Sequence, residues 1–160
     1  MNVIQAGITV QNELIAIIIS RFNDFINKNL LSSTIDTLTR LGQVQEKQIK
    51  IFQVPGSYEI PITANSIAKT NYFKAIITLG TIIKGETSHF KYITSAISSN
   101  LTKISIDYSI PIACGLLITN NIEQAIERAG LKMGNKGHEA ALCALEMINL
   151  LKIINQKKYT

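Results

Sequence analysis

The sequence has few of the residues from which metal sites are built. It contains two cysteines, two histidines and no tryptophan. Cys114 and Cys143 are far apart and form no Cys-x-x-Cys pair, and His89 and His138 do not complete a zinc-binding set. We therefore expect no metal site. Two isolated cysteines in apolar surroundings are typical of reduced core residues.

Long apolar runs and clustered charges are also missing. No segment approaches the length of about 18 apolar residues that a transmembrane helix needs. The opening MNVIQAGITV lacks the basic region and long apolar stretch of a signal peptide. These absences predict a soluble, cytoplasmic protein with no membrane partner. The net charge is +5, and much of the excess lies in Lys152, Lys157 and Lys158 near the C-terminus. The other basic residues are scattered along the chain, so nucleic-acid binding is not expected.

The sequence does contain enough apolar residues for one hydrophobic core. Its 160 residues are 46% hydrophobic and 17% charged, which is typical of a globular domain rather than a disordered chain. Because aromatic residues make up only 6%, the core must be built mainly from Ile, Leu, Ala and Val. We find no internal repeat and no interior linker, so residues 1–160 are expected to form a single domain.

Short apolar runs alternate with longer amphipathic segments, which predicts βαβ units around a parallel sheet. The first run, Leu14–Ile19, is continuously apolar, as expected for a strand covered on both faces. The expected strands are 14–19, 48–54, 75–83 and 112–118. The expected helices are 24–41, 58–69, one from 87 to beyond 101, a short one from 122 to 130, and one that opens at 134–137 and ends at 154.

Three local patterns set the expected ends of these helices. Gly42 is a plausible C-cap for the first helix. Pro61 is tolerable in the second helix because it falls in the first turn. Asn120, with Glu123 three residues later, resembles a capping box for the short fourth helix.

In an open parallel sheet, ligands bind beyond the carboxyl ends of the strands. Four segments of this chain follow a predicted strand and contain polar or aromatic residues. They are 21–23, 55–59, 84–89 and 119–120. We expect any ligand site to be formed by these segments.

The third segment has the composition of a phosphate-binding loop. Gly85 permits a backbone conformation that other residues resist, and Thr87 and Ser88 add hydroxyl groups beside the free N–H groups of a helix N-terminus. The same residues also cap ordinary helices, and this second interpretation is equally supported by the pattern. His89, in the first turn, could act as an acid and base beside a bound anion, or could be a surface histidine. His138 lies away from any strand end and is interpreted as structural.

The other candidate residues also have two interpretations each. Phe22 could stack on a planar heterocycle, but a hydrophobic staple at the start of the helix is favoured by the pattern alone. Glu59 could accept hydrogen bonds from a ring N–H group, or simply place a favourable charge in a first turn. Arg128 and Lys136 could bind phosphate, and the alternative for Arg128 is a solvated helix face.

Five stretches in order along the chain together resemble the 6,7-dimethyl-8-ribityllumazine synthase family. The resemblance runs from about Asn2 to Lys152. The stretches are SRFN (20–23), VPGSYEIP (54–61), LGTIIKGETSHF (79–90), IEQAIERAG (122–130) and GNKG (134–137). The resemblance implies a flavodoxin-like α/β fold, namely a three-layer α/β/α sandwich with a central four-stranded parallel sheet.

The resemblance implies a role for each matching residue. His89 matches the catalytic histidine, and Phe22 matches the aromatic residue that stacks on the pyrimidine. Glu86, Thr87 and Arg128 match residues that bind the phosphate of the butanone substrate, and Lys136 matches a supporting basic residue. The residues that match the ribitylaminouracil site are, besides Phe22, Ser57, Tyr58, Glu59, Thr81, Ile82, Ile83 and Cys114.

The resemblance further implies a reaction and an assembly. The reaction is the condensation of 5-amino-6-(D-ribitylamino)uracil with 3,4-dihydroxy-2-butanone 4-phosphate, the penultimate step of riboflavin biosynthesis, without any cofactor. The family forms pentamers, which in many members build a sixty-subunit icosahedral capsid, and its active sites lie between neighbouring subunits. Riboflavin synthase is a further expected partner. The two rival hypotheses are a catalytically silent shell protein and a flavodoxin-like binding module for a phosphorylated ligand.

Three residues depart from the pattern of the family. Tyr58 stands where Phe is usual and adds a hydroxyl group. Glu86 stands where many members have a small residue, and its carboxylate would repel a bound phosphate unless the side chain turns away. Cys114 stands where many relatives have a Phe that covers the heterocycle.

Overall fold

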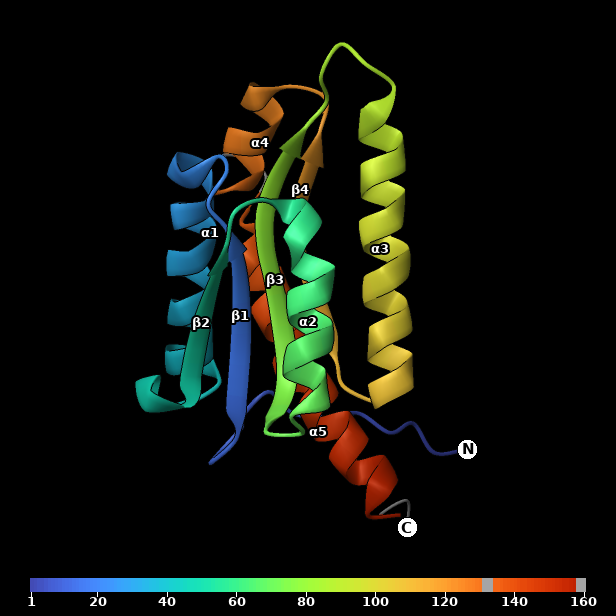
Figure 1. Cartoon of the computed structure of the whole chain (residues 1–160). Coiled ribbons are helices and arrows are strands. Elements are labelled where there is room, and N and C mark those ends of the chain that lie inside the picture. The colour runs from blue at the N-terminus through green and yellow to red at the C-terminus, as the bar shows by residue number, and fades with distance from the viewer. Residues whose placement is uncertain (131–133, 158–160) are drawn as a thin grey trace.

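The computed structural model describes residues 1–130 and 134–157 as one parallel sheet with helices on both faces (Figure 1). The four predicted strands are confirmed, each to within two residues at either end. The strands are β1 Leu14–Ser20, β2 Ile49–Val54, β3 Phe73–Ile83 and β4 Ile112–Thr119. The helices are α1 Asp24–Asp36, α2 Ile60–Lys69, α3 His89–Tyr108, α4 Ile122–Arg128 and α5 Lys136–Asn155.

All strand pairs in the sheet are parallel, and the strand order is β2-β1-β3-β4. Helices α1, α4 and α5 cover one face, and α2 and α3 cover the other (Figure 1). The predicted three-layer, flavodoxin-like α/β/α arrangement is therefore confirmed. Because every strand runs the same way, all four carboxyl ends meet at one edge of the sheet.

The continuous apolar run of β1 is explained by its central position. Residues on the two sides of the strand alternate between two cores. Ile15, Ile17 and Ile19 pack in the core under α1 and α5, whereas Ala16 and Ile18 pack in the core under α2. All five are at most 4% exposed. Burial of each isoleucine contributes about 1.5–3 kcal/mol, so β1 stabilises both cores.

The first helix ends differently from the prediction. It changes at Thr37 into a short π-helical segment, Thr37–Leu41. Gly42 has φ −80°, so it is not the left-handed C-cap that the pattern predicted. A Cβ atom at Gly42 would instead lie 2.7 Å from the Leu145 side chain of α5. The same Cβ atom would lie 2.7 Å from the backbone carbonyl oxygen of Leu38, so a glycine fits this turn better than any other residue.

The starts of two other helices are also shifted. A 3₁₀ turn, Ser57–Glu59, precedes α2, and Pro61 lies in the first turn of α2 as predicted. The cap of α4 is one residue later than predicted: the Asn121 side chain accepts a hydrogen bond from the backbone N–H of Gln124 (2.9 Å). The Gln124 side chain in turn accepts one from the backbone N–H of Asn120 (2.9 Å).

The outer part of α3 and the edge strand β4 are incompletely covered within one chain. Ile106 and Tyr92 of α3 are 72% and 74% exposed. Cys114 in β4 and Cys143 in α5 are also exposed, so the prediction of two core cysteines is wrong. Cys114 is exposed because it lies on the face of β4 towards α3, where a cavity between α3 and β4 leaves it uncovered. Within the described residues, no helix is long and apolar enough to cross a membrane.

Candidate active site

The four predicted segments meet at the carboxyl edge of the sheet, as expected. This edge is the upper one in Figure 1, opposite both chain termini. Backbone hydrogen bonds join the segments in pairs. The N–H of Arg21 donates to the carbonyl of Val54 (2.8 Å), and the N–H of Lys84 donates to the carbonyl of Thr119 (2.9 Å). The start of the first segment is therefore held against the end of β2, and the third segment is joined to the fourth.

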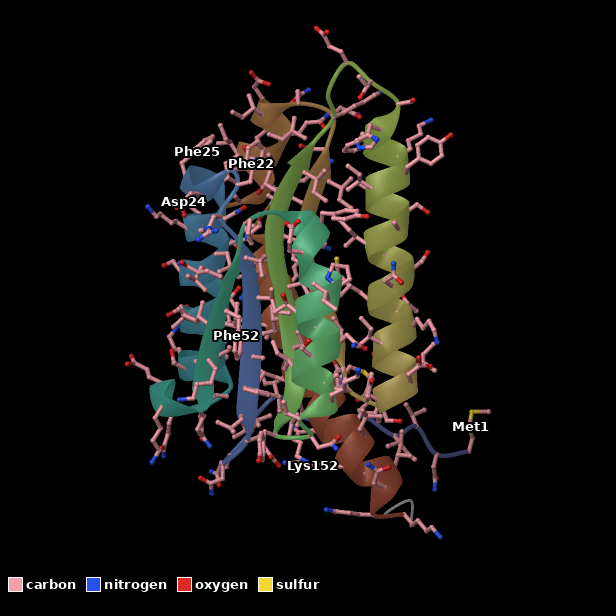
Figure 2. All side chains as sticks on the ribbon, in the orientation of Figure 1. Met1, Phe22, Asp24, Phe25, Phe52 and Lys152 are labelled. Atoms are coloured by element: carbon pink, nitrogen blue, oxygen red, sulfur yellow. The ribbon has the colours of Figure 1, made fainter. Side chains whose placement is uncertain are left out.

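Two asparagines hold Phe22 in an exposed position beside the start of α1 (Figure 2). Asn23 has the left-handed φ of 65°, and its side chain donates to the carbonyl of Thr81 (2.9 Å). The buried Asn27 side chain donates to the carbonyls of Ser20 (2.7 Å) and Phe22 (2.9 Å). The loop is thus tied to α1 and β3 while the Phe22 side chain remains 72% exposed.

These contacts decide between the two interpretations of Phe22. A hydrophobic staple requires an apolar residue at the fourth helical position for Phe22 to pack against. That position is occupied by Asn27, and the ring of Phe22 faces solvent. The staple interpretation is therefore wrong, and the exposed ring is available to stack on a planar ligand.

Asn27 is a residue that the sequence interpretation missed. Its amide oxygen accepts a hydrogen bond from the Thr81 hydroxyl (2.7 Å), so its amide has partners on both β1 and β3. Asn27 is fully buried. The available signal was its spacing from Leu30, Thr34 and Leu38, which places a polar side chain on the buried face of the helix.

The same contacts restrict how Thr81 can act. Its hydroxyl donates to Asn27 and its carbonyl accepts from Asn23, so both groups are used inside the protein. The residue is 2% exposed. Its place in the predicted substrate-binding set therefore remains a prediction, and the contacts of its side chain position the Phe22 loop. Ile82 and Ile83 are only half-buried at the end of β3.

The loop between β2 and α2 provides Ser57, Tyr58 and Glu59. Tyr58 is 68% exposed, so its additional hydroxyl group is open to solvent. Tyr58 and Glu59 line a largely apolar cavity of about 420 Å³ between α2 and α3, together with Ile62, Ile97 and Asn100. An apolar wall with one carboxylate suits a planar, uncharged ring that can donate a hydrogen bond.

The loop between β3 and α3 is exposed from Lys84 to Ser88. Helix α3 begins at His89, and Ser88 occupies its N-cap position. Among the described residues, neither Ser88 nor Thr87 makes a side-chain capping hydrogen bond. This finding weakens the ordinary-cap interpretation of the loop. The role predicted for Gly85 is wrong: its φ is not positive, and a Cβ atom there would meet open space.

His89 and His138 have opposite environments. His89 is the first residue of α3, and its side chain is exposed. In the described part of the chain its ring makes no hydrogen bond. His138 instead has Nδ1 at 2.7 Å from the hydroxyl of Thr37, so it joins α5 to the π-helical turn. Of the two histidines, His89 has an imidazole that is free to contact a ligand.

Arg128 and Lys136 lie together but apart from His89. They line a cavity of about 380 Å³ beside β4, and Lys136 is 3.6 Å from Glu139. Cys114 lines a different cavity of about 260 Å³ between α3 and β4. Neither Arg128 nor Cys114 shares a cavity with His89 within one chain. The predicted site residues that one chain does bring to the same edge of the sheet are Phe22, Tyr58, Glu59, Thr87 and His89.

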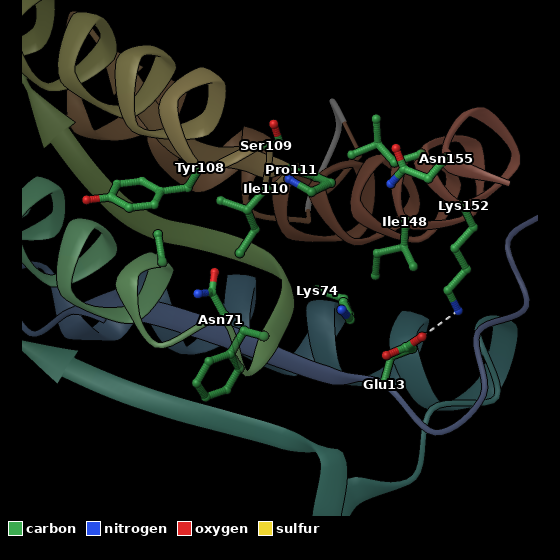
Figure 3. A pocket seen from close by; sticks show the side chains of 13 residues that line it. Glu13, Asn71, Lys74, Tyr108, Ser109, Ile110, Pro111, Ile148, Lys152 and Asn155 are labelled. Carbon is green, nitrogen blue, oxygen red and sulfur yellow. Dashed lines mark ion pairs between the residues drawn. The ribbon is translucent and has the colours of Figure 1, made fainter. Parts of the chain in front are cut away.

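A further cavity of about 290 Å³ lies at the opposite edge of the sheet (Figure 3). Its lining includes Glu13, Lys74 and Lys152, and the carboxylate of Glu13 is 2.6 Å from the ammonium group of Lys152. This ion pair joins the start of β1 to α5. None of the predicted site residues lines this cavity. Among residues 1–130 and 134–157, no group of three or more His, Cys, Asp or Glu side chains could hold a metal ion.

The fold and this edge define a class of protein: a parallel α/β protein with a ligand site beyond its strand ends. Comparison with known proteins identifies the family. Residues 13–152 match the family model for 6,7-dimethyl-8-ribityllumazine synthase. The chain belongs to this family.

Similar proteins with this name cover nearly the whole chain. One from Buchnera aphidicola subsp. Schizaphis graminum (strain Sg) is 62% identical over 152 residues, 95% of this chain and 96% of the relative. One from Buchnera aphidicola subsp. Acyrthosiphon pisum (strain APS) is 59% identical over 159 residues, 99% of each chain. One from Yersinia pestis (strain Pestoides F) is 53% identical over 154 residues, 96% of this chain and 99% of the relative.

Proposed function

We propose that this chain is a transferase that condenses 5-amino-6-(D-ribitylamino)uracil with 3,4-dihydroxy-2-butanone 4-phosphate. The product is 6,7-dimethyl-8-ribityllumazine, and the step is the penultimate one of riboflavin biosynthesis. The observation that best supports this proposal is the exposed Phe22 ring on the same edge of the sheet as the unpaired imidazole of His89. The reaction requires a surface on which the planar pyrimidine can stack and a group that transfers protons.

The reaction needs proton transfers but no oxidant or reductant. The ring amine attacks the ketone and water leaves, which gives an imine. Inorganic phosphate is then eliminated, and the ribitylamino nitrogen closes the second ring as another water leaves. His89 supplies and removes protons in these steps, worth roughly 10²–10⁴-fold in rate. Most of the remaining acceleration comes from holding the two reactants together.

The uracil substrate is assigned to the surface between Phe22 and the 57–59 loop. Phe22 stacks on the pyrimidine: its ring is exposed, and its loop is held by the buried Asn27 and the partly buried Asn23. Glu59 accepts a hydrogen bond from a ring N–H, and Ser57 and Tyr58 provide further polar contacts. Ile82 and Ile83, half-buried at the end of β3, contact the ligand beside them.

The butanone phosphate is assigned to the loop before α3. The N–H groups at the start of this helix favour an anion, and Thr87 adds a hydroxyl group. Glu86 contributes through its backbone, because its exposed side chain can point away from the anion. Arg128, supported by Lys136, binds the phosphate from a neighbouring subunit. The segment around Cys114 also comes from a neighbouring subunit, and it contacts the uracil substrate. The proposed contribution of a second subunit agrees with the single chain, in which Arg128 and Cys114 line cavities that do not include His89.

The proposal therefore includes a homo-oligomer, with a pentamer as the smallest complete unit and an icosahedral capsid as a larger one. Riboflavin synthase, which uses the product, is a proposed partner. We also propose a cytoplasmic location, because Cys114 and Cys143 are exposed and unpaired, and such thiols stay reduced there. Light scattering on the purified protein distinguishes a pentamer from a capsid.

The direct test is to mix purified protein with both substrates and follow the absorbance of the lumazine. We expect product and inorganic phosphate to appear in equal amounts. A silent shell protein would form particles without product, and a simple binding module would bind a ligand without releasing phosphate. Either result would contradict the proposal.

A further inference from the structure

The cavity at the edge where the strands begin is separate from the proposed active site (Figure 3). Its volume of about 290 Å³ is close to the lower end of the range for small-molecule sites, which is about 300–1,000 Å³. The cavity lies at the start of β3, whereas the candidate site residues lie where the strands end. Because β3 has 11 residues, the two edges of the sheet are roughly 30 Å apart.

The inner wall of this cavity is apolar. Ala68, Ile110 and Ile148 line it and are 3%, 6% and 3% exposed. Phe73 and Pro111, which are partly buried, extend the same wall. A buried apolar wall binds the apolar body of a ligand and offers nothing to a fully hydrated inorganic ion.

The outer part of the cavity carries a net positive charge. The ammonium group of Lys152 lies 2.6 Å from the carboxylate of Glu13, so these two charges compensate each other. Lys74 also lines the cavity, and its side chain is exposed. Among the described residues, Lys74 takes part in no ion pair. Two positive charges and one negative charge leave a net charge of +1, which Lys74 provides.

The helix ends around the cavity limit the charge that it can accept. Tyr108 and Asn155, the last residues of α3 and α5, line it, and so does Asn71, two residues beyond the end of α2. A helix C-terminus carries a partial negative charge. Together with Glu13, these helix ends disfavour an anion with two charges. A single negative charge is favoured only where it contacts Lys74 directly.

We propose that this cavity binds a small organic monoanion, namely a carboxylate attached to an apolar ring or short chain. The carboxylate accepts hydrogen bonds from the ammonium group of Lys74 and the exposed amide of Asn71, and the apolar body packs against Ile110 and Ile148. The proposal does not depend on the proposed function, because none of the residues assigned to the two substrates lines this cavity.

Three probes test the chemistry of the site in the assembled full-length protein. Benzoate has the proposed charge and an apolar ring, benzamide has the same ring without the charge, and inorganic phosphate has charge without an apolar body. Binding is followed by NMR titration of the ligand signals. We expect a Kd of about 1–10 mM for benzoate, at least threefold weaker binding of benzamide, and no displacement of benzoate by an equal concentration of phosphate. Absence of benzoate binding, equal affinity for benzamide, or displacement by phosphate would each overturn the proposal.

Substitution of Lys74 locates the binding. Lys74→Gln should raise the Kd of benzoate roughly 3–10-fold, whereas Lys74→Arg, which keeps the charge, should bind benzoate nearly as well as the wild-type protein. Lys50→Gln is the matched control. Lys50 is the second residue of β2, as Lys74 is of β3, and it is exposed and does not line the cavity. An unchanged Kd in Lys74→Gln, or an equal loss in Lys50→Gln, would show that benzoate binds elsewhere.

Discussion

Replacing Asn27 by Asp tests whether a buried amide positions the ligand site. The substitution keeps the size of the side chain and keeps an acceptor for the Thr81 hydroxyl. It removes the two hydrogen bonds that Asn27 donates to the carbonyls of Ser20 and Phe22. Each buried carbonyl left without its partner costs about 1–3 kcal/mol, so the free energy of unfolding should fall by about 2–6 kcal/mol. That is a large part of a typical total of about 5–15 kcal/mol.

The loss should depend on pH with a defined sign. The new carboxyl is buried and faces two carbonyl oxygens, so its folded-state pKa should lie above the unfolded value of about 3.9. Between these two pKa values the native state of Asn27→Asp binds more protons than the unfolded state. Its stability should therefore be highest below about pH 4 relative to wild type, and should decline as pH rises towards the folded-state pKa.

The assay is urea unfolding at several pH values, paired with calorimetric binding of ribitylaminouracil. Asn29→Asp is the matched control, because Asn29 lies on the same helix with an exposed side chain. We expect the control to resemble wild type in both measurements. If Asn27→Asp unfolded at the wild-type urea concentration throughout the pH range, or bound the uracil as tightly as wild type, Asn27 would not hold the Phe22 loop.

Three further predictions concern the catalytic group, the phosphate contact and the core. His89→Ala should lower kcat by roughly 10²–10⁴-fold but leave residual activity, because both substrates are still held together; wild-type kcat would remove the acid–base assignment. Arg128→Ala should raise KM for the butanone phosphate by at least tenfold with little change for the uracil, as an Arg–phosphate contact is worth about 1.5–3 kcal/mol; equal losses for both substrates would refute this. Gly42→Ala should destabilise the fold by about 1–3 kcal/mol through its clashes with the Leu145 side chain and the Leu38 carbonyl, measured as a lower urea midpoint; an unchanged midpoint would show that both neighbours can move away at no cost.

The fold could be predicted from the sequence wherever burial alone decides the local structure. The run Leu14–Ile19 is apolar on both sides, and only a covered central strand accommodates that pattern. The details of the helix ends could not be predicted, because tertiary contacts determine them. Gly42 resembles a left-handed cap in the sequence, but its role depends on Leu145, which is distant in the chain.

The location of the candidate site followed from the strand ends, but its supporting contacts did not. Phe22 and His89 each follow a strand, and parallel strands end at one edge. Asn27 was not recognised, because its role depends on a partner in β3 that no local pattern specifies. Thr81 carries a hydroxyl beside the site in sequence, yet that hydroxyl faces the core under α1.

The most direct test of the account is complementation between two impaired variants, His89→Ala and Arg128→Ala, assayed at a butanone phosphate concentration well below the KM of Arg128→Ala. If each site takes His89 from one chain and Arg128 from its neighbour, chains dissociated, mixed equally and reassembled should form intact sites at roughly a quarter of the interfaces. We predict that the mixture regains close to that share of wild-type lumazine formation, while each variant reassembled alone keeps only its own low activity. A mixture no more active than its components would contradict a site shared between neighbouring chains.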